Sequence, residues 1–167
     1  RVRLDTEALA PALSAPSHPK QEAWSNQKQV TLLWKDPPDL SGIEGYYYGF
    51  DRKEHPAPEA SRMTWTSSRT ASFALPEEGV WFAHVLAKDK AGNIGPSATY
   101  KLQVDCASKA PVVKSPTHQS GAWSKLNTPK FIWERPQELS GVEGYYLSLD
   151  SQPHTIPGPN AGKWTTE

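Results

Sequence analysis

The chain has 167 residues with 18 basic and 18 acidic side chains, so its formal net charge is zero. A neutral chain offers no basic field to neutralise phosphate groups, which excludes nucleic acid as an expected partner. No apolar run approaches the roughly 20 residues that a spanning helix needs, so no membrane span is predicted in this segment. The 16 prolines, 11 glycines and 7 tryptophans favour short strands joined by many turns.

Strand patterns dominate the first 105 residues. Pro11 interrupts the segment 6–13, so we interpret that segment as a linker into a first strand rather than as a helix. The polar, proline-bearing segment 52–62 is typical of a loop or a weak edge strand. Further strands are predicted at 29–35, 46–51, 63–67, 70–75, 80–88 and 98–105. Seven short strands per unit indicate an all-β fold, an antiparallel β-sandwich of two sheets.

Alternation within the predicted strands separates core residues from surface residues. Tyr46, Tyr48 and Phe50 share the face that we expect to line the core, because side chains two residues apart point the same way. Tyr47 is then expected on the opposite, exposed face.

Two segments of the chain are near-copies of each other. Residues 34–51 read WKDPPDLSGIEGYYYGFD, and residues 133–150 read WERPQELSGVEGYYLSLD, an offset of 99 (133 minus 34). The same offset relates three tryptophans of the first copy, Trp24, Trp34 and Trp65, to Trp123, Trp133 and Trp164. A fixed long period predicts one folding unit that is used more than once.

The repeat predicts the domain organisation. Residues 1–5 match 101–105 and are interpreted as the last strand of a preceding unit. Residues 6–105 form one complete sandwich, and residues 106–167 form the N-terminal part of a second. A sandwich without three of its strands leaves open edges and half a core. We therefore expect a fragment of a longer array; the alternative is that another chain supplies the missing strands.

Three segments, in this order, resemble a fibronectin type III domain or a related bacterial Ig-like domain. They are VTLLWKDPPDLSGIEGYYYGF, Leu75 followed six residues later by Trp81, and WFAHVLAKDKAGNIGPSA. Trp81 stands where the family has a corner tyrosine, so packing and the indole N–H have to hold this position. The resemblance covers about 100 residues and implies tandem repeats of a large secreted or surface bacterial protein, hence an extracytoplasmic location.

Four aromatic residues are candidates for a ligand site. An exposed Tyr47 beside Trp65 would form a platform for a sugar or a peptide, and Tyr146 with Trp164 would repeat it. The alternative is that these side chains only pack across neighbouring strands. The other repeated tryptophans are expected to have structural roles: Trp34 and Trp133 in the core, Trp24 and Trp123 in core or junction packing.

No metal, cofactor or catalytic site is predicted. Asp51, Asp89 and Asn93 raise the possibility of calcium, but the turn at 89–93 supplies too few of the six to eight oxygens that calcium needs. The single cysteine, Cys106, cannot form an internal disulfide. Five histidines are dispersed and lack metal-ligand spacing: His18, His55, His84, His118 and His154. Four of them form repeat pairs, His18 with His118 and His55 with His154, which favours a structural role in each unit.

These patterns favour a non-catalytic structural or spacer module, or an interaction module, within a larger extracytoplasmic bacterial protein. Its expected partners are proteins or further repeats of the same chain, and a glycan is possible. Two alternatives stay open. One is a glycan- or protein-binding adhesion module that uses the exposed aromatics, and the other is the accessory or sensor ectodomain of an enzyme or receptor whose chemistry lies elsewhere.

Overall fold

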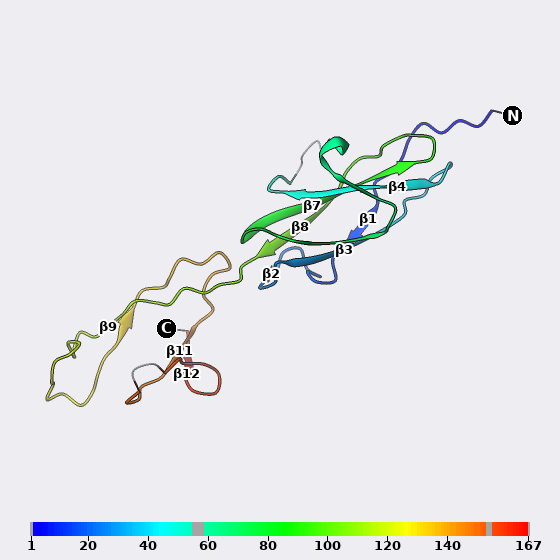
Figure 1. The fold of residues 1–167 in the computed structure, drawn as a ribbon. Coiled ribbons are helices and arrows are strands. Elements are labelled where there is room, and N and C mark those ends of the chain that lie inside the picture. Colours follow the sequence, from blue (N-terminus) through cyan, green and yellow to red (C-terminus); the bar gives the residue numbers. More distant parts are fainter. Residues whose placement is uncertain (1, 55–58, 153–154, 167) are drawn as a thin grey trace. The chain divides into compact units, whose positions relative to one another are not determined.

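The computed structural model describes residues 2–54, 59–152 and 155–166, so His55 and His154 lie outside the described residues. The chain divides into a first unit, Arg1–Ala107, and a second unit, Ser108–Glu167 (Figure 1). Within the described residues the structure is all-β, and its one helical element is a single 3-10 turn, η1 (Ala60–Arg62). No helix in the described ranges is long and apolar enough to cross a membrane.

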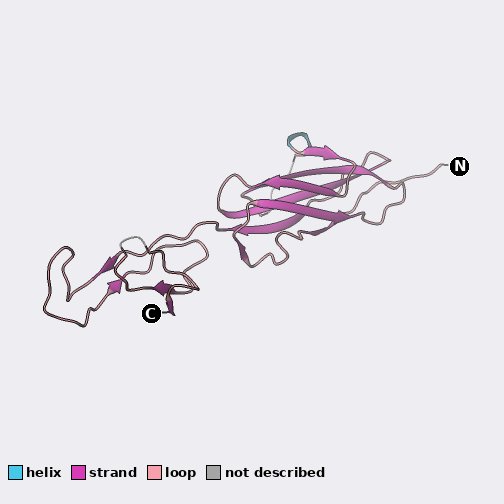
Figure 2. Cartoon of the chain, turned by 60° about the horizontal axis from the view of Figure 1, so that its bottom comes forward, coloured by secondary structure: helices cyan, strands magenta, loops and turns pink. Residues whose placement is uncertain are grey.

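The first unit contains two sheets (Figure 2). Three antiparallel strands form the smaller sheet, in the order β1 (Ala12–Ser14), β3 (Gln29–Lys35) and β6 (Thr70–Ala74). Five strands form the larger sheet, in the order β2 (Trp24–Ser25), β8 (Ala98–Val104), β7 (Gly79–Asp89), β4 (Ile43–Asp51) and β5 (Thr64–Thr66). Only the β2–β8 pair of this sheet is parallel; the others are antiparallel.

One apolar core joins the two sheets. Val30, Leu32 and Trp34 of β3 are buried at alternate positions, as a strand with one covered face requires. Facing residues come from the larger sheet, where β7 contributes Ala83 and Val85, both with no exposed surface. Sheets that share a core in this way are consistent with the predicted β-sandwich.

The predicted strands of the first unit are found within one residue at their ends, except at the start of β4. β2 was not predicted, and its parallel pairing with β8 departs from the expected antiparallel sandwich. Two further differences concern β4 and the segment 1–5. β4 begins at Ile43 rather than at Tyr46, because the turn before it ends at Gly42, whose φ of 85° reverses the chain, and Ile43 pairs at once with Asp89. The described part of the predicted strand 1–5 is not a strand. The matching residues 101–104 belong to β8, which pairs with β7. No described strand of this chain pairs with residues 2–5.

The second unit consists of two short antiparallel pairs. β9 (Val113–Lys114) pairs with β10 (Ile132–Trp133), and β11 (Tyr145–Leu147) pairs with β12 (Lys163–Thr165). None of its described residues is buried, whereas the buried apolar residues of the chain run from Ala8 to Val104. The expected packing of Trp123 is therefore wrong, because its side chain is fully exposed.

Candidate functional site

Tyr47 and Trp65 form the aromatic pair predicted from the sequence. They stand directly opposite each other on β4 and β5, with ring centroids 4.8 Å apart and planes at 60°. Trp65 is 42 % exposed, but Tyr47 is only partly exposed. The prediction of an exposed Tyr47 is wrong in degree, because the indole of Trp65 covers part of its ring.

Two charged side chains border the Trp65 ring. The Lys88 Nζ atom lies 5.8 Å from the ring centroid, within the range of a cation–π interaction. The same ammonium group contacts Glu44 at 2.7 Å, and this hydrogen bond raises the pKa of Lys88. An indole beside an ammonium and a carboxylate group offers an apolar face and polar contacts together, which suits a sugar ring or a peptide side chain.

The second unit repeats the pair. Tyr146 of β11 and Trp164 of β12 have ring centroids 4.8 Å apart and planes at 58°, and Trp164 is 42 % exposed. The structure thus brings each predicted tyrosine to its predicted tryptophan within one unit. The same residues at the same spacing thus adopt the same cross-strand pairing in both units.

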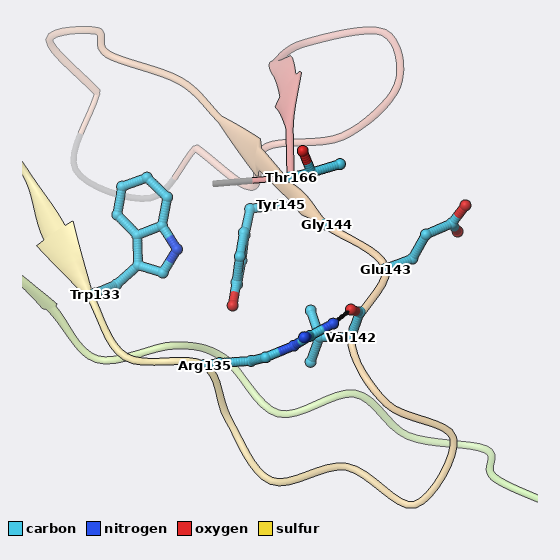
Figure 3. Close-up of a pocket in the computed structure, with 7 residues that line it drawn as sticks. All are labelled: Trp133, Arg135, Val142, Glu143, Gly144, Tyr145 and Thr166. Atoms are coloured by element: carbon cyan, nitrogen blue, oxygen red, sulfur yellow. Dashed lines mark hydrogen bonds between the residues drawn. The ribbon is translucent and has the colours of Figure 1, made fainter.

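A cavity of about 180 Å³ lies in the second unit (Figure 3). The side chain of Tyr145 lies beside Trp133, with its hydroxyl group toward Arg135. The Arg135 guanidinium donates a hydrogen bond to the Val142 carbonyl oxygen. Glu143, Gly144 and Thr166 complete the lining. The sequence reasoning missed this site. The sequence feature that could have marked this site is Arg135, which occupies the position of Asp36 in the first copy.

In the first unit the position equivalent to Arg135 is Asp36, which forms an ion pair with Arg69. Arg69 contacts Asp36 through Nε at 2.5 Å and through Nη2 at 2.7 Å. The Tyr46 hydroxyl donates a hydrogen bond to the same carboxylate. These hydrogen bonds, from Arg69 first and Tyr46 second, lower the pKa of Asp36 to about 2. Burial, together with the hydrogen bond to Asp36, raises the pKa of Tyr46.

The buried histidine of β7 is held by structural partners. His84 is 2 % exposed, with Nδ1 at 3.1 Å from the Thr99 hydroxyl group and Nε2 at 3.4 Å from the Asp51 carboxylate. In the turn between β1 and β2, His18 is buried likewise, and its Nε2 lies 3.0 Å from the Gln27 carbonyl oxygen. These contacts agree with the structural role that the repeat predicted for His18, and they give His84 structural partners as well.

The carboxylates considered for calcium do not lie together. Asp51 and Asp89 are at opposite ends of β4 and β7, because Asp51 pairs with Phe82 and Asp89 with Ile43. Asp89 lies instead near Asp5 and Asp39, with carboxylate oxygens within 4.8 Å of one another. Turn groups bind these oxygens: Asn93 donates to Asp89, and the Ser41 backbone N–H donates to Asp5 and Asp39.

Trp81 of β7 is held by a hydrogen bond and by a charged neighbour. Its indole N–H donates a hydrogen bond of 3.0 Å to the Glu77 carbonyl oxygen, as the sequence reasoning required. The Arg52 guanidinium lies 3.7 Å from the centre of the indole ring and adds a cation–π contact.

No protein-family model matches the chain, and no curated protein matches it significantly.

Proposed function

We propose that this chain is a non-catalytic structural and spacing segment built from repeated β-sandwich units of the fibronectin type III or Ig-like kind. Its role is to hold other parts of a larger extracytoplasmic bacterial protein apart and to present them. The resemblance of the repeated segments to such domains supports the family and the location.

One observation carries this proposal: the repeated residues build the same local architecture twice. The Trp34–Tyr46 pair has ring centroids 5.5 Å apart at 64°, and the Trp133–Tyr145 pair has them 5.4 Å apart at 68°. The recurrence of these residues with the same geometry is explained by a role in folding each unit, without a ligand. Within the first unit, polar side chains that reach the interior, such as His84 and Asp89, are also bonded to structural partners.

A second candidate function is favoured by the exposed part of Trp65. With 42 % of its surface accessible and charged groups beside it, the indole suits stacking against a sugar ring or a peptide side chain. In this function the chain is an adhesion module that binds glycans or proteins through Trp65 and, in the second unit, Trp164.

Binding and stability measured on the same variants separate the two functions. The purified chain, Tyr47→Ala and Trp65→Ala are applied to a glycan array, and their free energies of unfolding are measured in urea. For a spacer we expect no saturable binding and a loss of stability in both variants. Saturable binding by the wild type that Trp65→Ala abolishes without unfolding would establish the adhesion function instead. Turnover of any substrate by the purified chain would contradict both.

A further inference from the structure

The smaller sheet of the first unit ends in a strand with one unpaired side. β6 pairs with β3 over all five of its residues and without a register shift, and no described strand pairs with its other side. β6 lies in the middle of the first unit, with strands of the same core before and after it. Its open edge therefore belongs to a unit that has both of its sheets and its core.

The backbone groups of β6 alternate between its two sides. The Leu75 N–H, one residue after β6, donates to the Lys28 carbonyl oxygen, one residue before β3. Because the backbone groups of successive strand residues point to opposite sides, the odd-numbered residues of β6 face β3. Thr31, opposite Ser72, likewise turns its N–H away from β6 and donates to the Ser17 hydroxyl oxygen. The residues whose N–H and C=O groups point to the unpaired side are Thr70, Ser72 and Ala74.

The other described edges of this unit are covered or short. In the larger sheet β2 covers the end of β8, and the Lys101 N–H of β8 donates to the Gln21 side-chain oxygen. β1 and β5 have only three residues each, and β1 lies between Pro11 and Pro16. β6 is longer and contains no proline and no charged side chain. Sheets use such devices to prevent pairing with another chain, so the edge of β6 is a template for one.

The sequence of β6 is complementary to itself in one antiparallel register. When Ser72 stands opposite Ser72 of a second copy, Thr70 stands opposite Ala74. All three outward-facing residues then meet outward-facing residues, which is the arrangement of hydrogen-bonded pairs. In the same register the partly buried Phe73 stands opposite Ala71. The small alanine side chain leaves room for the aromatic ring across the contact.

Charges beside β6 favour the antiparallel direction. Arg69 immediately precedes β6, and its side chain is 63 % exposed. Glu77 follows β6, and its side chain is 78 % exposed. Antiparallel pairing brings the start of one β6 to the end of the other, so the two signs come together, whereas parallel pairing places like charges side by side. Exposed ion pairs are weak, so these charges set the direction and the backbone hydrogen bonds supply the affinity.

We propose that two copies of this chain associate side by side through β6, which pairs antiparallel with β6 of the second copy about an axis at Ser72. The two smaller sheets then continue as one sheet across the contact. Such a contact adds lateral association between molecules to the spacing role. It is separate from the aromatic pair at Trp65, because β5 belongs to the larger sheet.

Charge substitution at Ser72 tests this register on the full 167-residue chain. Ser72 is exposed, and the proposed register places it opposite itself, where like charges repel and opposite charges attract. Sedimentation equilibrium from about 10 µM to 1 mM, the range in which a small interface is populated, should show the wild type approaching the mass of a dimer. Ser72→Lys and Ser72→Glu should each weaken the dimer about fivefold, and an equimolar mixture of the two should restore it.

Gln29 provides the matched control. It is exposed on the same face of the sheet, but it lies in β3, one strand away from the contact. Gln29→Lys and Gln29→Glu should therefore associate like the wild type, alone and when mixed.

Three results would overturn the proposal. One is a wild type that stays monomeric at 1 mM, the upper end of the range given above. Another is association that charges at Ser72 do not change. The third is association that both charged variants weaken and that their mixture does not restore. If urea unfolding shows that a charged variant is destabilised, hydrogen exchange of the wild-type Ser72 amide decides. Protection of this amide that rises with protein concentration supports the contact, and protection independent of concentration contradicts it.

Discussion

The indole ring of Trp65 lies directly over Gly45. A methyl group built on Gly45 would come within 2.6 Å of the Cζ2 atom of Trp65 and within 2.8 Å of the Thr66 carbonyl oxygen. Both contacts are shorter than van der Waals distance, so the absence of a side chain at residue 45 is what lets the indole reach Tyr47. Gly144 has the same relationship to Trp164.

The first prediction concerns this glycine. Gly45→Ala should lower the free energy of unfolding by ~1–3 kcal/mol, because the added methyl group overpacks against an indole and a backbone carbonyl. Gly49→Ala is the matched control in the same strand, since its methyl group would meet Met63 Cγ at an ordinary 3.6 Å. The control should be neutral or stabilising by ~0.4–1 kcal/mol. Equal urea midpoints for the two variants would contradict this role of Gly45.

The second prediction concerns the acid stability of the first unit. Arg69 and Tyr46 lower the pKa of Asp36 from 3.8 to about 2 in the folded state. A group with a depressed folded pKa stabilises fully above its unfolded pKa, and this contribution is lost as the pH falls from about 4 toward 2. Asp36 is 38 % exposed, so screening by water reduces its contribution to about 1 kcal/mol.

Urea unfolding at pH 7 and at pH 2.5 measures this contribution. Asp36→Asn removes the titrating group, so between these pH values the variant should lose about 1 kcal/mol less stability than the wild type. Glu22→Gln is the control, because Glu22 forms an exposed ion pair with Lys101 and is 83 % accessible. A pH dependence of Asp36→Asn identical to that of the wild type would show that the carboxylate does not stabilise the fold.

The strands of the first unit were predictable because their side chains alternate and turn residues bound them. Gln29–Lys35 was predicted to the residue, since Val30, Leu32 and Trp34 occupy alternate positions of this segment and all three are buried in the core. The early start of β4 was not predictable, because Glu44 and Gly45 break the alternation. Ile43 joins the sheet only through its partner Asp89, which is distant in the sequence.

The candidate site was predictable in its residues and not in its environment. The repeated spacing identified both tyrosine–tryptophan pairs, and cross-strand register brings them together. The half-burial of Tyr47 depends on Gly45, whose significance appears only when the indole is in place. The cavity around Trp133 was not predicted from the sequence. Whether a tryptophan side chain is buried depends on the segments that pack around it, and not on its residue type alone.

The third prediction concerns the corner at Trp81. Trp81→Phe should cost ~1–3 kcal/mol of stability, because it removes the indole hydrogen bond to the Glu77 carbonyl oxygen and weakens the contact with Arg52. Glu77→Ala keeps that carbonyl group and removes only an exposed side chain that pairs with Arg52, so it should cost ~0–1 kcal/mol. Equal losses in urea unfolding would mean that the ion pair, and not the indole, holds the corner.

The last prediction is that the two units resist proteolysis unequally. The buried apolar residues described run from Ala8 to Val104, whereas the described second unit has no buried residue. A segment with few buried contacts opens at low free-energy cost, so trypsin should cleave after Lys125 or Lys130 before it cleaves within β7 or β8. Mass spectrometry of the digest should show a resistant fragment that contains residues 2–107.

Core substitution provides the control for this digest. Trp34→Ala removes a side chain that is 3 % exposed and should cost ~3–5 kcal/mol, so the resistant fragment should disappear in this variant. Trp133→Ala, at the repeated position, should leave the fragment unchanged, because Trp133 is only partly buried and lies in the other unit. A second unit as resistant as the first would show that its apolar face is covered in solution.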